Sequence, residues 1–177
     1  MSRLLGVVLL CAALTSCTVA IPGPPPKPVP TTSPRVDKPR NLAAFDPCEA
    51  MPTDGSSPNL KAAAAPPALD ASRRGFCKYT FRYPNGDMTV LAGLEEIEYD
   101  EVKKAHPNGH QGQIDGHTVW FGCDENGGEQ DCGAWAAVGH ARSLTVKAGS
   151  PGASEAWLQF QLTILIQFAL DRLPVSS

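Results

Sequence analysis

Two groups of residues in this sequence carry side chains that could ligate a metal ion. The run Asp124–Asp131 holds four carboxylates in eight residues, but it lacks the register of an EF-hand loop and its closing bidentate glutamate. His106 and His110 are four residues apart, yet Pro107 and Gly109 interrupt any helix that would present both on one face. We therefore predict no metal site and no bound cofactor, and we interpret the acidic run as a solvated turn.

The sequence contains no spacing of nucleophile and base that is typical of an enzyme. Neither Gly-x-Ser-x-Gly nor Ser-x-x-Lys occurs. Ser150 and Ser154 lie beside glycines before a predicted helix, where helix capping explains them. We predict no catalytic residues and a protein that is not an enzyme. A small secreted hydrolase remains the alternative, and it would need a histidine–acid pair around His117 or His140.

Cys17 ends an N-terminal segment in which a basic residue, an apolar run and small residues follow one another as in an export signal. Arg3 is followed by the 11-residue apolar run Leu4–Leu14, which is too short to span a bilayer. Leu14-Thr15-Ser16-Cys17 then resembles a bacterial lipobox. That likeness implies a signal peptide over residues 1–16, diacylglycerol transfer to the Cys17 thiol, and acylation, for example with palmitate, of the freed amine. Two or three acyl chains anchor a protein firmly. An ordinary secretory signal with Cys17 as a bystander is the alternative.

Four cysteines remain once Cys11 and Cys17 are set aside. An even number in an exported domain indicates disulfides, with three possible pairings. Proximity in the sequence favours Cys48–Cys77 and Cys123–Cys132. A redox-active pair is the alternative, but the sequence has no Cys-x-x-Cys.

The composition divides the chain into a linker and one domain. Eight of the 17 prolines fall between Pro22 and Pro39, which favours an extended, disordered tether. We expect the lipidated cysteine and linker over residues 17–44 and a globular domain over 45–177. Apolar residues make up 42% of the chain, enough for a packed core, and the net charge of −3 is unlike that of a nucleic-acid binder.

Alternating polarity predicts the strands of this domain. Residues 76–83 place Cys77, Tyr79, Phe81 and Tyr83 on one side, and 88–94 returns as a partner strand after a turn. Further strands are expected over 117–123, 132–138 and 143–147. If aromatic side chains on these strands stay exposed on the sheet face away from the C-terminal helix, they would form an apolar groove.

Two helices are expected beside the strands. A short one is predicted over 95–106 and a longer one from about Glu155 to Asp171, followed by Pro174. In the longer helix, polar residues recur every fourth position, and we expect the apolar side chains Trp157, Phe160, Ile164, Leu165 and Phe168 to face inward. A long strand over 158–168 is the alternative, because polarity there also alternates with period two. The predicted fold class is α+β, with a small antiparallel sheet, a C-terminal helix packed on one face and two disulfides.

These features together resemble a group of actinobacterial, mycobacterial-type secreted lipoproteins. The resemblance rests on the lipobox, the tether, Asp46-Pro47-Cys48, Cys77-Lys78-Tyr79 and Ile114-Asp115-Gly116, and it covers roughly residues 45–174. The globular part of these lipoproteins is a domain of unknown function, so the resemblance implies a location and a fold and brings no catalytic residues.

We therefore expect a protein anchored by lipid on the extracytoplasmic face of the cell membrane. As a non-catalytic module of the cell envelope it would bind a lipid or an envelope protein, and no nucleic acid. A structural or accessory subunit of a membrane complex is a further alternative.

Overall fold

The computed structural model describes residues 34, 36–84, 86–126 and 129–176. The expected signal peptide, Cys17 and most of the expected linker lie outside the described residues. The ordered elements are η1 (Leu42–Ala44), η2 (Pro47–Glu49), β1 (Ala68–Leu69), β2 (Phe76–Tyr83), β3 (Gly86–Glu95), α1 (Tyr99–Ala105), β4 (His110–Ile114), β5 (His117–Asn126), β6 (Glu129–Gly139), β7 (Arg142–Gly149) and α2 (Glu155–Arg172). The predicted α+β class is confirmed.

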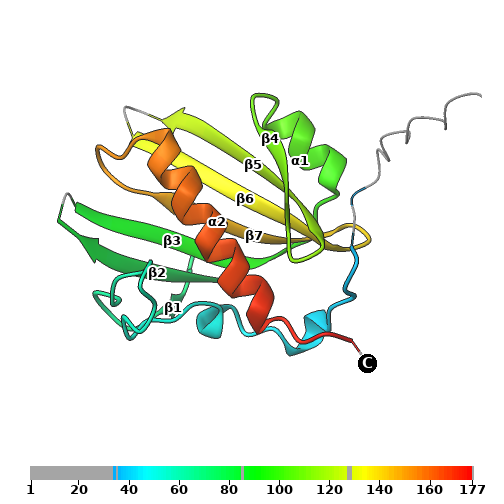
Figure 1. Cartoon of the computed structure of the whole chain (residues 1–177), viewed down its shortest axis with the longest axis horizontal. Coiled ribbons are helices and arrows are strands. Elements are labelled where there is room, and N and C mark those ends of the chain that lie inside the picture. Colours follow the sequence, from blue (N-terminus) through cyan, green and yellow to red (C-terminus); the bar gives the residue numbers. More distant parts are fainter. Residues whose placement is uncertain (1–33, 35, 85, 127–128, 177) are drawn as a thin grey trace, which may run out of the picture. The chain divides into compact units, whose positions relative to one another are not determined.

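The strands form one antiparallel sheet of seven strands in the order β1-β2-β3-β7-β6-β5-β4 (Figure 1). The five predicted strands are all present, and β3, β5, β6 and β7 are longer than expected. The two edge strands β1 and β4 were not predicted. The sequence of β4, His-Gln-Gly-Gln-Ile, lacks the polar–apolar alternation of a half-buried strand, and pairing with β5 holds it in place.

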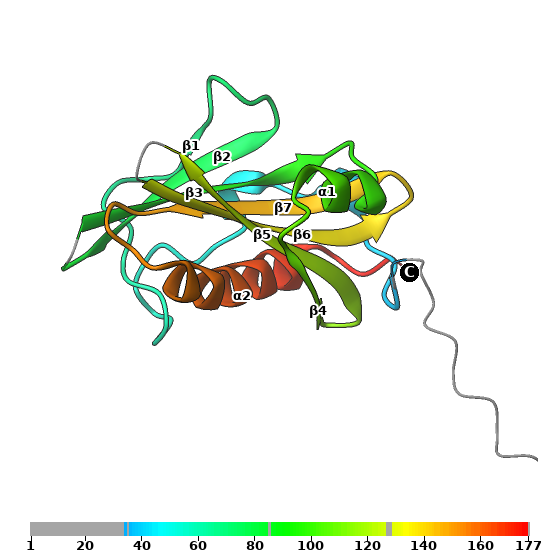
Figure 2. The same cartoon turned by 90° about the horizontal axis from the view of Figure 1, so that it is seen from above.

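Helix α2 crosses the sheet and packs mainly on β6 and β7 (Figures 1 and 2). Its buried side chains, including Leu158, Leu162 and Leu165, meet the apolar face of the sheet and form the main core with it. The strand alternative for this segment is therefore wrong. No helix in the described part of the chain is long and apolar enough to cross a membrane.

Our expectation that Phe160 faces inward is also wrong. Its side chain is 59% exposed, and Trp157, Ile164 and Phe168 are only partly buried. Leu165 alone of the five residues expected inside is fully buried. The reason is that apolar residues surround α2 on all sides, so the sequence pattern did not determine which side meets the sheet.

Helix α1 packs on the opposite face of the sheet from α2 (Figure 2). It is shorter than predicted, because Glu95 is the last residue of β3 and the helix begins only at Tyr99. Glu98 caps it, and Glu98 and Glu101 form a capping box. Tyr99 and Val102 of α1 cover Trp120 on β5 and Trp135 on β6, and these side chains form a second, smaller core.

The folded domain begins before the expected boundary at residue 45. Val36 bridges to His117, and Arg40 bridges to Val175 beyond the end of α2. The Arg40 side chain is buried and donates hydrogen bonds to the carbonyls of Leu170 (3.1 Å) and Leu173 (2.9 Å). Residues from Val36 onward that were assigned to the linker are therefore packed against the sheet and the C-terminal segment.

Candidate functional site

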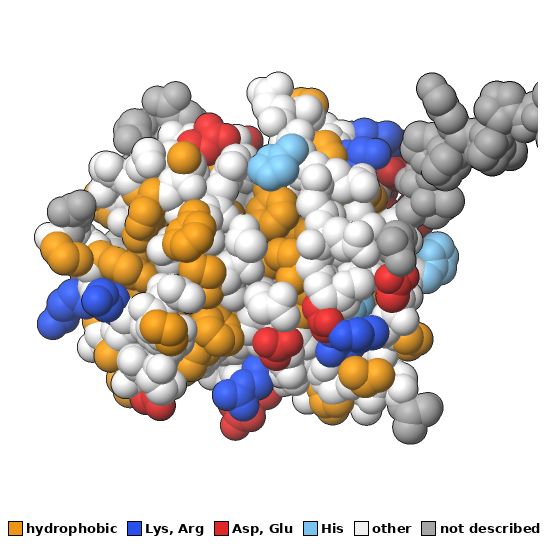
Figure 3. All heavy atoms as spheres, in the orientation of Figure 1, with side chains coloured by type: hydrophobic (Ala, Val, Ile, Leu, Met, Phe, Trp, Pro, Cys, Tyr) orange, Lys and Arg blue, Asp and Glu red, His pale blue; other side chains and the backbone are white. Residues whose placement is uncertain are grey.

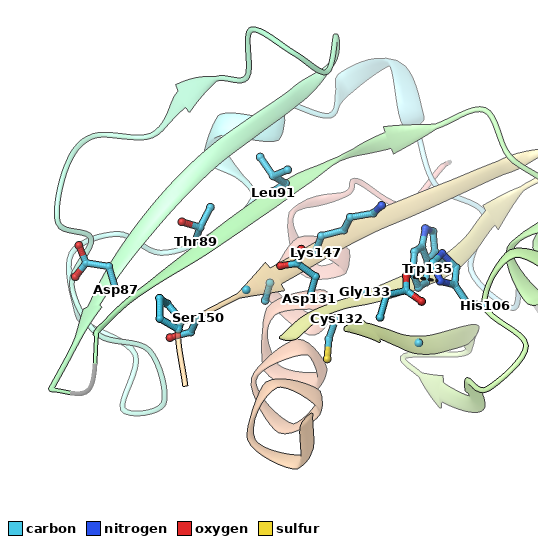
Figure 4. A pocket seen from close by; sticks show the side chains of 15 residues that line it. Asp87, Thr89, Leu91, His106, Asp131, Cys132, Gly133, Trp135, Lys147 and Ser150 are labelled. Atoms are coloured by element: carbon cyan, nitrogen blue, oxygen red, sulfur yellow. Dashed lines mark ion pairs between the residues drawn. The ribbon is translucent and has the colours of Figure 1, made fainter. Parts of the chain in front are cut away.

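The sheet face away from α2 carries a hollow of about 570 Å³ between β3 and the end of α1 (Figure 4). Side chains on alternate positions of β3, β7, β6 and β5 line it, as the pleat of a sheet requires. The volume falls within the range typical of small-molecule sites. Its principal lining residues are Thr89, Leu91, His106, Asp131, Trp135 and Lys147.

Glycines line the bottom of this hollow, and their lack of side chains leaves room above the strands. Gly122 and Gly133 are directly paired across β5 and β6, and Gly149 is paired with Asp131 across β7 and β6. A Cβ atom at Gly133 would overlap the ring of Trp135, and one at Gly149 would overlap the carboxylate of Asp131. Glycine inside a strand often marks such a close approach, and here it lets two larger side chains lie down on the sheet.

Four side chains form a row across the hollow. Lys147 Nζ lies 5.6 Å from the centroid of the Trp135 ring. The His106 imidazole stacks on that ring, with the centroids 4.4 Å apart. On its other side, His106 Nδ1 lies 3.0 Å from Asp124 Oδ2, although the two are not aligned as a hydrogen bond. The row therefore runs from the Lys147 cation through the rings of Trp135 and His106, which Figure 4 shows, to the carboxylate of Asp124.

The end of α1 places His106 in this row. His106 is the C-cap of the helix, and its backbone N–H donates to the Val102 carbonyl at 2.9 Å. Its own carbonyl accepts a hydrogen bond from Trp120 Nε1 at 3.1 Å. These two bonds tie the residue to both α1 and β5, so that the imidazole lies against Trp135.

Lys147 is the cation of the hollow, and no carboxylate lies within ion-pair distance of it in the described part of the chain. Partial burial lowers the pKa of its ammonium, as does the nearby charge of Arg73, while Glu95, Asp124 and Asp131 act in the opposite direction. Arg73 itself forms an ion pair with Glu95. The Lys147 ammonium thus keeps donors that no side chain of the site uses.

The hollow combines hydrogen-bond donors with acceptors over a small area. Lys147 supplies donors, the carboxylates of Asp124 and Asp131 supply acceptors, and the Thr89 hydroxyl supplies both. Trp135 is nearly buried, so it contributes only a small part of its surface. The aromatic groove that the sequence suggested for this face is not formed, because Trp120 and Trp135 are covered by α1 and His106.

The predicted disulfides are confirmed, and both lie on the α2 side of the sheet. Cys48–Cys77 joins η2 to β2, and Cys123–Cys132 joins β5 to β6 at directly opposed positions. They stabilise the domain from behind the hollow. Cys17, the predicted lipidation residue, lies outside the described residues.

The structure brings only some of the residues weighed as metal ligands together. Asp124 and Asp131 face each other across β5 and β6. His106 lies on the hollow side, while His110 stacks on Phe121, which belongs to the core under α2. Among the described residues, no group of three or more His, Cys, Asp or Glu side chains is placed to hold a metal ion.

The hydrolase alternative called for a histidine–acid pair around His117 or His140, and these two histidines lie in different surroundings. His117 is fully buried, its Nδ1 contacts the Ala137 carbonyl at 2.8 Å, and its Nε2 accepts a hydrogen bond from Arg40 Nε at 3.2 Å. His140 lies exposed in the turn between β6 and β7. Burial lowers the pKa of His117, as expected for a neutral side chain in a structural network.

The sequence analysis did not predict that the side chains of this site lie close together, namely those of Lys147, Trp135, Asp131 and His106. These residues come from two strands and a helix end, and only the register of β5, β6 and β7 makes them neighbours. The signal that could have indicated them is the occurrence of glycines within predicted strands. A comparison with known proteins finds no matching family, no similar curated protein and no similar solved structure.

Proposed function

We propose that the protein is a lipid-anchored lipoprotein on the extracytoplasmic face of the cell membrane that binds a ligand in this hollow without transforming it. The lipobox-like order ending at Cys17 supports the anchor. The observation that carries the binding function is the partly buried ammonium of Lys147, which lies in the hollow and has no carboxylate at ion-pair distance among the residues that the structure describes. An ammonium group has three N–H donors, and a ligand in the hollow could accept hydrogen bonds from them.

The mixture of hydrogen-bond donors and acceptors in the hollow favours a hydroxyl-rich ligand. We propose that this ligand is a saccharide of the cell envelope. Each hydroxyl both donates and accepts, so it can satisfy Lys147 and a neighbouring aspartate together. A purely anionic ligand would meet Asp87, Asp124 and Asp131, and a purely apolar one would bury these charges at a cost. The apolar contact available to a sugar ring comes from Leu91 and the edge of Trp135.

Titration calorimetry with soluble oligosaccharides released from the cell wall tests this proposal. Lys147→Met should weaken binding by about ten- to a hundredfold, because a hydrogen bond from a charged group contributes about 1.5–3 kcal/mol. The matched control is Lys78→Met, which removes an exposed lysine of β2 that does not line the hollow. Equal affinities for the two variants, or no binding by the unaltered chain, would contradict the proposal.

The alternative of a small hydrolase rests on one feature of the site. A histidine beside a carboxylate, as in His106 and Asp124, is an arrangement used for general-base catalysis. Mass spectrometry of the same oligosaccharides after incubation distinguishes the two functions. Intact oligosaccharides support a binding module, whereas cleavage that is lost in His106→Gln supports the hydrolase.

A further inference from the structure

One side of α2 presents apolar side chains that the fold buries only in part, since Trp157 and Phe168 also pack against the edge of the core. Phe160 is 59% exposed, and Trp157, Ile164 and Phe168 beside it are only partly buried. Their spacing of three, four and four residues places them along one side of the helix. Figure 3 views this face of the molecule and shows hydrophobic side chains gathered along the course of α2. Phe160 and its partly buried neighbours form an apolar strip, and exposed apolar surface of this kind is a feature of interaction sites.

The polar residues on the same side of α2 carry almost no charge. Thr163 donates its hydroxyl to the Gln159 carbonyl at 3.0 Å, and Gln167 donates to Asp171 at 2.9 Å. Asp171 is the only charged side chain on this side, and it lies in the last turn. The complementary surface must therefore be apolar along the middle of the helix and must accept a carboxylate at one end.

We propose that this surface binds a second copy of the chain, with the two α2 helices antiparallel about a two-fold axis at Ile164. Ile164 lies seven residues from both Trp157 and Asp171, and four residues from both Phe160 and Phe168. Antiparallel pairing about this point places each Phe160 opposite Phe168 of the second copy. The surface is thus complementary to itself, as a two-fold interface requires.

The charges at the ends of α2 favour this direction of pairing. Asp171 falls beside the N-terminal turn of the opposite helix, where the helix dipole favours a carboxylate. Parallel pairing would instead place Asp171 beside Asp171 and Arg172 beside Arg172.

Disulfide cross-linking of the full-length chain in its own membrane tests the proposal. Ile164→Cys, at the axis, should give a covalent dimer several-fold more abundant than Leu69→Cys, the matched control on β1, whose side chain is 71% exposed. Adding Phe160→Asp to the Ile164→Cys chain should return the dimer to the control level. The amount of monomer of each variant is also measured, so that a loss of dimer is not mistaken for a loss of folded protein.

The direction of pairing is tested by co-expressing two differently tagged chains. Phe160→Cys in one and Phe168→Cys in the other should cross-link to each other more than either does to itself. Preferential self-cross-linking of Phe160→Cys would overturn the antiparallel arrangement. The dimer itself would be overturned if Ile164→Cys cross-linked no more than Leu69→Cys, or cross-linked to a different protein.

Discussion

Replacing Arg40 with methionine should destabilise the domain strongly, because this side chain joins the N-terminal segment to the end of α2. Its side chain is only 4% exposed and forms an ion pair with Asp115. It also donates to His117 Nε2 at 3.2 Å and to the Leu170 and Leu173 carbonyls at 3.1 and 2.9 Å. Leu173 is the C-cap of α2, so its carbonyl has no acceptor role within the helix, and the Leu170 carbonyl also accepts from the Leu173 N–H at 3.1 Å.

Methionine would fill much of the same space but would leave the Leu173 carbonyl and His117 Nε2 without this donor, while Asp115 keeps its ion pair with Lys38. Leaving a buried acceptor without its hydrogen bond costs about 1–3 kcal/mol, and we expect a loss in the free energy of unfolding within that range. The control is Arg142→Met, because Arg142 is 43% exposed and pairs with the 78% exposed Glu96. An exposed pair contributes at most about 1 kcal/mol, so the control should change little.

Urea unfolding followed by tryptophan fluorescence measures both variants, in chains that begin at Thr18. Arg40→Met should shift the midpoint far below that of Arg142→Met, with an unchanged dependence on urea concentration. If the two variants lose the same free energy, Arg40 does not hold the segment before Phe45 in the folded domain. The reasoning about the domain boundary would then be refuted.

Three further predictions concern the histidine network, a disulfide and the anchor. Folding lowers the pKa of His117 below its ordinary 6.5, mainly through burial and the Arg40 charge. Below about pH 6.5 the unfolded chain therefore binds a proton that the folded chain does not, and stability should fall by up to about 1.4 kcal/mol per pH unit. Unfolding at a series of pH values should show a flatter profile in His117→Gln than in His140→Gln. Replacing both Cys48 and Cys77 with alanine opens a disulfide-closed loop of 29 residues and should lower the free energy of unfolding by about 3.5 kcal/mol. Opening the nine-residue loop closed by Cys123–Cys132 should cost about 2.5 kcal/mol. Calorimetric unfolding that reversed this order would refute the estimate. Cys17→Ala should release the protein from membranes, and its continued recovery in the detergent phase would argue against a lipid anchor.

The sequence predicted those parts of the fold that local polarity determines. The alternation over Phe76–Tyr83 places one side of a strand in the core, and the structure has this strand with the same bounds. The disulfides followed from proximity along the chain, since each joins neighbouring parts of the fold. The polar residues at every fourth position indicated α2 correctly, although the period-two alternation of the same segment had left a strand open.

Features that depend on distant contacts could not be predicted in this way. Arg40 reads as part of a proline-rich linker, and its partners Asp115 and Leu170 lie 75 and 130 residues away. Phe160 and Leu165 are equally apolar, so only packing against the sheet determines which one is buried. The hollow was missed for the same reason, since it depends on the strand register that brings Lys147 beside Gly133.

The central claim, that the hollow on the sheet face away from α2 is the binding site, is tested most directly by nuclear magnetic resonance. The backbone amides are monitored while cell-wall oligosaccharides are added to the chain that begins at Thr18. We predict that the amides of Gly133, Lys147 and Gly149 shift on binding, while those of Leu158 and Leu165 in α2 do not. Shifts confined to α2, or no shifts at concentrations that saturate binding in calorimetry, would contradict the proposal.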